Sequence, residues 1–383
     1  MSVTSPLGFR GAGVAAGIKE SGDPDVAVVL NDGPSAAAAG VFTANRVKAA
    51  PVLWSQQVLA GRTVRAVVLN SGGANACTGP AGFQDTHQTA EHMAGLLQIG
   101  AGEVAVCSTG LIGERLPMDK LLGGVDAAVA DASRAGGLAA ADAIRTTDSV
   151  VKIAFRRGTG YTIGGMAKGA GMLAPGLATM LCVLTTDAEL APAELDAALR
   201  AATAVTFDRL DTDGCMSTND TVLLMASGAA GVSPEKSEFI LALTEVCADL
   251  ARQLQLDAEG AEKMITIEVV GAASEADAVT AGRAVARNNL LKCAIGGEDP
   301  NWGRVLAAVG TTDAVFQPDR LNVAINGIWV CRHGAPGDER SKVDLKPKDV
   351  TITVDLSAGP HSATILTTDL TAAYVHENSA YST

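Results

Sequence analysis

The sequence predicts an α/β protein of layered helices and mixed β-sheets, arranged as two lobes. Short β-rich runs alternate with alanine-rich helical patterns along almost the whole chain, which is typical of layered helices and sheets. At 383 residues the chain exceeds the usual size of a single hydrophobic core, so two lobes are expected. Apolar residues make up 48% of the chain and aromatic residues only 3%, so aliphatic side chains must fill the cores.

Local periodicity predicts the individual elements. Residues 64–70 and 103–109 have the composition of buried strands, and residues 83–99 between them have the pattern of an amphipathic helix. The clearest helix spans residues 233–256, with Ser233 as its N-cap and a proline at its first position. Three further strands are expected at residues 264–274, 320–326 and 350–356. Two further helices are expected, one within residues 185–203 and one at residues 275–294.

Net charge, apolar segments and cysteines indicate the partners and the cellular location to expect. The formal net charge of −13 argues against nucleic acid and against anionic membrane surfaces as partners. No window offers about 18 uninterrupted apolar residues, and the N-terminal stretch lacks a long apolar core of the signal-peptide type. The seven cysteines are scattered and form no CxxC pair, which favours buried, reduced thiols. We therefore expect a soluble cytoplasmic protein.

Several common catalytic motifs are absent from the sequence. It contains no HExxH, no P-loop and no GxSxG elbow. The five histidines have no metal-ligand spacing, and the glycines of residues 164–176 do not fit a dinucleotide fingerprint. The sequence therefore predicts neither a metal site nor a bound cofactor.

What remains is a set of clusters rich in glycine, threonine and asparagine. Each is typical of a turn, because these residue types dominate turns. Backbone amides in such turns are also what an oxyanion site requires. The clusters lie at residues 70–79, 107–117, 145–152, 211–221 and 296–304.

The stretch from residue 168 to residue 188 poses a sharper question. It is glycine-rich, bends at Pro175-Gly176, and delivers Thr179 into an apolar run. A β-branched residue that starts a strand is the commoner explanation on these residues alone. If the bond after Ala178 were cut, however, Thr179 would gain a free α-amine with a pKa of about 8, able to act as base for its own hydroxyl.

These segments together resemble the ornithine acetyltransferases (glutamate N-acetyltransferases) of the cyclic arginine pathway. The resemblance covers nearly the whole chain, and its most specific part surrounds Ala178 and Thr179. It is carried by "GGMAKGAGMLAPGLATML", "CSTGLIGERLP", "TTDSVVK", "DTDGCMSTNDT", "EDPNWGR" and "HENSAYST".

The resemblance implies an N-terminal-nucleophile-like acetyltransferase fold and self-cleavage between Ala178 and Thr179. Residues 1–178 would form an α chain and residues 179–383 a β chain, which stay together as an α2β2 assembly. Thr179 would be acetylated by N2-acetylornithine and would pass the acetyl group to glutamate in a ping-pong scheme. Whether acetyl-CoA is also a donor stays open.

The resemblance also implies the site residues. Thr109 and Gly110 would form the oxyanion hole. Lys168 suits a substrate carboxylate and Glu259 the ornithine ammonium. The full set of implied substrate-binding residues is one of the pair Thr146 and Thr147, together with Lys168, Thr179, Glu259, Asn378 and Thr383.

Some positions depart from the pattern expected of relatives. Asn289 and Cys293 stand where a serine and a threonine are expected, and Gly214-Cys215 varies a turn to which we assign no catalytic role. Two other functions compete with acetyl transfer. One is an amidohydrolase or aminopeptidase that uses the same threonine but passes the acyl group to water. The other is a non-catalytic α/β protein in which Thr179 only starts a strand.

Overall fold

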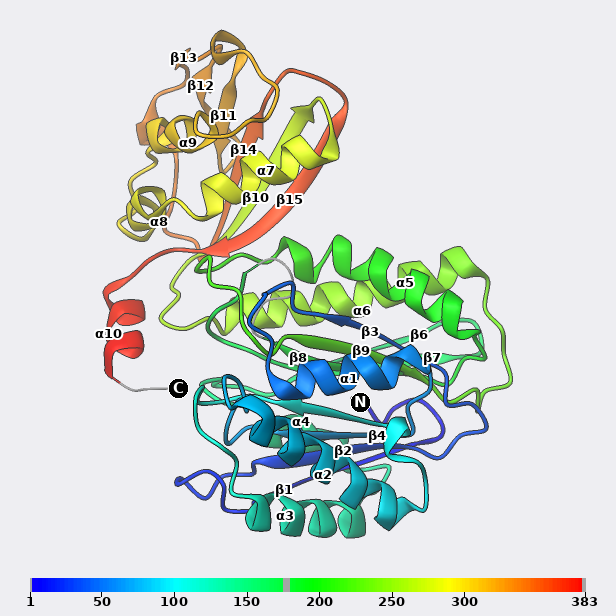
Figure 1. The fold of residues 1–383 in the computed structure, drawn as a ribbon. Coiled ribbons are helices and arrows are strands. Elements are labelled where there is room, and N and C mark those ends of the chain that lie inside the picture. Colours follow the sequence, from blue (N-terminus) through cyan, green and yellow to red (C-terminus); the bar gives the residue numbers. More distant parts are fainter. Residues whose placement is uncertain (1, 175–179, 381–383) are drawn as a thin grey trace. The chain divides into compact units, whose positions relative to one another are not determined.

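A computed structural model describes residues 2–174 and 180–380 (Figure 1). The chain divides into two compact units. The first runs to Asp208 and resumes from Cys215 to Leu254, and the second combines Arg209–Gly214 with the described chain from Gln255 to Ala380. The predicted α/β class with two lobes is confirmed. The boundary between these units is not at residue 178. The predicted α and β chains are defined by cleavage of the peptide bond rather than by compactness, so that division stays a prediction.

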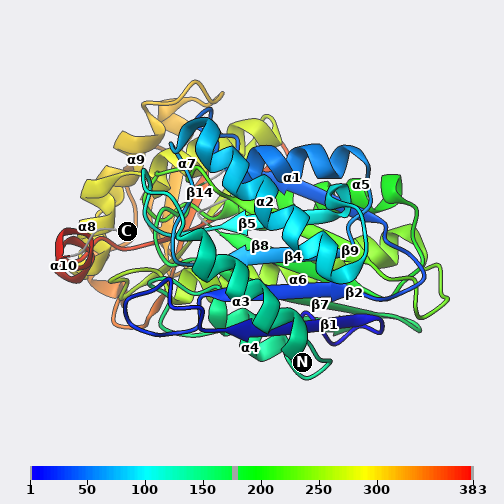
Figure 2. The same cartoon turned by 60° about the horizontal axis from the view of Figure 1, so that its bottom comes forward.

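The first unit contains a four-stranded sheet in the order β1-β2-β4-β5. β4 runs parallel to β5, and the other neighbours are antiparallel. Helices α1, α2, α3 and α4 pack against this sheet (Figure 2). The strands are Phe9–Val14, Val26–Asn31, Ala66–Asn70 and Val104–Ser108, and the helices are Ala50–Ala60, Gly79–Leu97, Met118–Asp131 and Gly137–Ala143.

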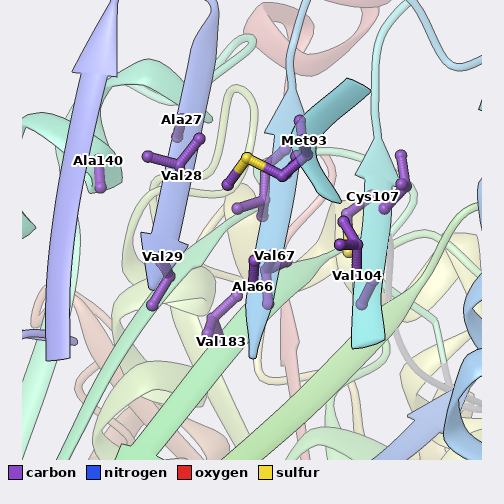
Figure 3. Packing of buried hydrophobic residues seen from close by; sticks show 14 of the residues in the cluster. Ala27, Val28, Val29, Ala66, Val67, Met93, Val104, Cys107, Ala140 and Val183 are labelled. Atoms are coloured by element: carbon purple, nitrogen blue, oxygen red, sulfur yellow. The ribbon is translucent and has the colours of Figure 1, made fainter. Parts of the chain in front are cut away.

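A five-stranded sheet in the order β3-β9-β8-β7-β6 completes the first unit. One hydrophobic cluster joins the two sheets, and it includes Val67 of the first sheet and Val183 of the second (Figure 3). α5 (Pro192–Ala204) packs on β3, and α6 spans Lys236–Leu256. In the order of the sheet, the strands are Ala38–Phe42, Thr221–Ala226, Leu181–Thr186, Thr162–Lys168 and Lys152–Arg157.

The second unit is built on a six-stranded mixed sheet in the order β13-β12-β11-β14-β10-β15. α7 packs on β10 and β15. The strands β10 to β15 are Met264–Ala272, Asn322–Ile325, Ile328–Arg332, Ala335–Pro336, Asp349–Asp355 and His361–Thr368. The helices α7 to α10 are Glu275–Ala286, Asn289–Gly296, Trp302–Val309 and Ala372–Ala380.

The structure corrects two helix predictions. α6 begins at Lys236, so the predicted cap at Ser233 is wrong. The single helix predicted over residues 275–294 is two helices, because the Asn288 side chain accepts a hydrogen bond from the amide of Leu291 and so starts α8 as a separate helix.

Three sequence predictions concern the cysteines, membrane spans and metal sites. None of the seven cysteines forms a disulfide, but Cys77, Cys215 and Cys293 are exposed, so the expectation of buried thiols holds for only the other four. No helix between residues 2 and 380, outside the gap at 175–179, is both long and apolar enough to cross a bilayer. Nor do three metal-ligating side chains gather in that part of the chain.

Candidate active site

The predicted oxyanion pair lies where two parallel strands end. β4 and β5 are parallel neighbours, so the segments that follow them meet at one edge of the sheet. The Thr109 amide donates to the Asn70 carbonyl at 3.0 Å, and the Gly73 amide donates to the Thr109 carbonyl at 3.0 Å. These bonds fix the turn that carries Thr109 and Gly110.

Gly110 is a position that only glycine fits. Its φ is +127°, and an added Cβ would lie 2.7 Å from the Gly73 nitrogen. The Gly110 amide donates no hydrogen bond to any residue that the structure describes, whereas the Thr109 amide is already used. An oxyanion at this turn would therefore be met by the Gly110 amide and the Thr109 hydroxyl.

Lys168 brings a buried positive charge to the same turn. It is the last residue of β7, is only 2% exposed, and its Nζ lies 3.3 Å from the Thr109 Oγ1. A lysine this deep in the protein requires compensation by a nearby negative charge.

Asp148 supplies that negative charge. Its Oδ1 accepts hydrogen bonds from Lys152 Nζ and from the Gly169 amide, both at 2.6 Å. Its Oδ2 accepts from the Thr146 amide at 3.0 Å. Burial alone would raise the pKa of Asp148, but the charges of Lys168 and Lys152 and these hydrogen bonds outweigh it and lower the pKa to about 2.

Asp148 therefore joins two of the predicted substrate segments. It binds the backbone of the turn that carries Thr146 and Thr147, both half-buried, and the glycine that follows Lys168. The sequence did not indicate this role for Asp148, because only folding brings Lys168 and Gly169 close to it.

Asn219 is a second residue that sequence reasoning missed. Its side-chain amide donates to the Ala74 carbonyl at 2.7 Å and to the Ser108 carbonyl at 2.8 Å. It thus joins the segment before β9 to the loop after β4 and to the last residue of β5. The only sequence signal was its place in the turn at residues 211–221.

Two other predicted residues lie in the second unit. Glu259 is half-buried in the loop after α6, and Asn378 is exposed on α10, where its amide donates to the Tyr374 carbonyl at 3.0 Å. The loop and the C-terminal segment are joined, because Thr371 Oγ1 donates to the Gly260 carbonyl at 2.6 Å. Up to Ala380, the terminal segment is thus helical and is hydrogen-bonded to the loop that carries Glu259.

The remaining predictions fall outside the described residues. These are the cleavage site Ala178-Thr179, with Thr179 as nucleophile, and the substrate contact assigned to Thr383. The structure thus brings together Thr109, Gly110, Lys168 and the Thr146 turn in the first unit.

A backbone amide without a partner among the described residues, a threonine hydroxyl and a buried lysine at the end of parallel strands define an α/β enzyme with a site suited to acyl transfer. The chain belongs to the ArgJ family, whose model matches residues 10–383. It is accordingly an acyltransferase of arginine biosynthesis, as the sequence predicted.

Relatives of this family are similar along the full chain. The arginine biosynthesis bifunctional protein ArgJ of Thermobifida fusca is 76% identical over 383 residues, which cover 100% of both chains. The protein of the same name from Streptomyces coelicolor is 67% identical over 382 residues, again 100% of both. A solved ornithine acetyltransferase of Mycobacterium tuberculosis, complexed with ornithine, is 62% identical with a TM-score of 0.45, and the match covers 47% of this chain and 96% of that chain.

Proposed function

We propose that the enzyme transfers an acetyl group from N2-acetylornithine to glutamate through an acetyl ester of Thr179. The observation that carries this proposal is the Gly110 amide, free of described partners, beside the Thr109 hydroxyl and the buried Lys168 amine. Strand β8 begins two residues after Thr179, and its first residue, Leu181, pairs with Lys168. A nucleophile at position 179 would thus be joined to the strand beside the lysine.

The proposed reaction begins with self-cleavage. The Thr179 hydroxyl attacks the Ala178 carbonyl carbon, the peptide C–N bond breaks, and the freed amine takes the hydroxyl proton. Water then hydrolyses the ester, which leaves a carboxylate on Ala178 and a free α-amine on Thr179. That amine is the base for the next step.

Transfer then proceeds in two halves. The Thr179 oxygen loses its proton to the amine and attacks the acetyl carbonyl of N2-acetylornithine. The Gly110 amide and the Thr109 hydroxyl stabilise the negative oxygen of the tetrahedral intermediate, and ornithine leaves with the proton. The amine of glutamate next attacks the ester, which yields N-acetylglutamate and restores the hydroxyl.

Substrate recognition in this proposal rests on charge. Lys168 pairs with the substrate carboxylate and Glu259 with the ornithine ammonium, while Thr146, Thr147, Asn378 and Thr383 supply polar contacts. No cofactor takes part. The α and β chains remain together as α2β2 in the cytoplasm. The relatives' name, bifunctional, also favours acetyl-CoA as a second donor to the same threonine.

Donor assays test the proposal. Purified protein is given N2-acetylornithine with glutamate, N2-acetylornithine with water alone, and acetyl-CoA with glutamate. Acetylglutamate formed in the first mixture supports the transfer from N2-acetylornithine. Acetylglutamate formed in the third mixture supports acetyl-CoA as a second donor. Release of free acetate at the same rate with and without glutamate would instead indicate an amidohydrolase.

A further inference from the structure

Asp220 is a buried carboxyl for which the proposed reaction has no use. It lies directly before β9 and is fully buried. Its Oδ1 accepts a hydrogen bond from the Met180 amide at 3.1 Å. Its Oδ2 is also buried and has no hydrogen-bond partner among the described residues. A buried carboxyl oxygen without a hydrogen-bond partner lowers the stability of the folded state, so its presence requires an explanation.

The surroundings of Asp220 favour its uncharged form. Burial raises the pKa of Asp220 well above its usual range. The Met180 amide, the Lys168 charge and the hydroxyls of Ser217 and Thr43 act in the opposite direction but are weaker. Lys168 thus lies in the field of two carboxyl groups with opposite pKa shifts, since the pKa of Asp148 is lowered. A neutral Asp220 still offers an acceptor oxygen to Met180.

Both backbone polar groups of Met180 are hydrogen-bonded. Its amide is bound by the Asp220 side chain, and its carbonyl accepts a hydrogen bond from the Thr221 amide at 3.1 Å. The next residue, Leu181, pairs with Thr221 in the parallel ladder of β8 and β9. Backbone pairing thus fixes the strand from Leu181 onward, and the Asp220 carboxyl extends that fixation by one residue toward the N-terminus.

We propose that Asp220 is a positioning residue for the nucleophile, which acts by holding the Met180 amide. The Met180 nitrogen is bonded to the carbonyl carbon of residue 179, so restraining this amide restrains the residue before it. This inference rests on the proposed function, in which Thr179 attacks first Ala178 and then the donor. A displacement of about 1 Å at a reacting atom can cost roughly 100-fold in rate.

The same strand provides a matched control. Asp187 directly follows β8 at its opposite end and is also buried. Its carboxyl accepts hydrogen bonds from two backbone amides, those of Leu7 at 2.9 Å and Thr162 at 2.7 Å. Asp187→Ala therefore removes the same kind of contact from the same strand, but away from residue 180.

The experiment compares Asp220→Ala, Asp220→Asn and Asp187→Ala in the full chain. Mass spectrometry follows the conversion of the precursor to two fragments, and steady-state assays on the cleaved fraction give kcat and KM. We expect Asp220→Ala to slow cleavage and to lower kcat by about 100-fold, with KM changed less than about threefold. Asp220→Asn keeps an uncharged acceptor oxygen and should recover most of both rates. Asp187→Ala should melt at a lower temperature yet cleave and turn over at close to the wild-type rates.

The outcomes separate this inference from the proposed function. Asp220→Ala that cleaves and turns over as fast as Asp187→Ala overturns the inference. Asp220→Asn that is as slow as Asp220→Ala also overturns it, because the carboxyl itself would then be needed. If Asp220→Ala does not fold, the asparagine variant still decides. Wild-type protein that stays uncut while fully active would instead refute the proposed function, and the inference with it.

Discussion

Asp148 accepts a 2.6 Å hydrogen bond from Lys152, and both side chains are completely buried. The same carboxyl group accepts hydrogen bonds from the Thr146 and Gly169 amides, so the ion pair is joined to both of these site segments. Buried ion pairs contribute little net stability, but loss of one partner strands a charge in a medium of low polarity.

We predict that Asp148→Asn destabilises the protein by about 3–5 kcal/mol, because Lys152 then keeps a buried charge without its carboxylate. The double variant Asp148→Asn with Lys152→Met should recover only the part of this free energy of unfolding that is lost at Lys152, because buried Lys168 still lacks the Asp148 charge. Chemical denaturation in an uncleaved Thr179→Ala background measures both. Equal losses in the single and double variants would contradict the role given to the pair.

Gly110→Ala should lower kcat by about 100- to 1000-fold, because the new Cβ would force the oxyanion turn away from Gly73. Gly113→Ala is the matched control. Gly113 also has a positive φ, of +92°, but an added Cβ would meet nothing within 4 Å. Steady-state kinetics of the two variants test the assignment, and an equal effect on kcat would attribute it to backbone strain alone.

The two buried aspartates predict opposite responses to pH. The pKa of Asp220 is raised on folding, so the folded state holds a proton that the unfolded state releases. Wild-type stability should therefore fall as the pH rises above about 4, with this group contributing about 1.4 kcal/mol per pH unit up to its raised pKa. Asp220→Asn should remove that slope when unfolding is measured from pH 4 to 7 in the Thr179→Ala background. Parallel curves for the two proteins would show that Asp220 is ionised in the folded state.

Asp148 behaves in the reverse sense. Its pKa is lowered to about 2, so its contribution is present above the ordinary value of 3.8 and is lost as the pH falls from about 4 to 2. Wild-type protein should lose stability more steeply over that acidic range than the double variant at Asp148 and Lys152. A wild-type curve with no steeper fall would contradict the lowered pKa.

Gly260→Ala tests the link between the Glu259 loop and the C-terminal segment. Gly260 has a φ of +60°, and an added Cβ would lie 2.1 Å from the Tyr374 nitrogen. We expect KM for N2-acetylornithine to rise by about tenfold, with a smaller change in kcat, because the change would displace Glu259, which we propose binds the ornithine ammonium. Gly231→Ala, at a φ of +62° with open space around it, should leave KM unchanged.

The sequence predicted the strands because buried runs of valine, leucine and alanine have a clear pattern. Residues 64–70 and 103–109 are β4 and β5 to within two residues. The break between α7 and α8 was missed, because the capping by Asn288 interrupts a pattern that otherwise stays helical.

Thr109, Gly110 and Lys168 were predicted through resemblance, and the fold brings them together. Asp148, Asn219 and Asp220 were not assigned roles, because each has at least one partner that only folding brings close. Asp148 contacts Gly169 across 21 residues and Asp220 contacts Met180 across 40.

The central claim is that Thr179 becomes an N-terminal nucleophile and carries the acetyl group. Intact mass under denaturing conditions, before and after mixing with N2-acetylornithine alone, tests it most directly. The account predicts two fragments, residues 1–178 and residues 179–383. The second fragment should be heavier by one acetyl group after mixing. A single uncut chain in fully active protein, or an acetyl group on another residue, would contradict it.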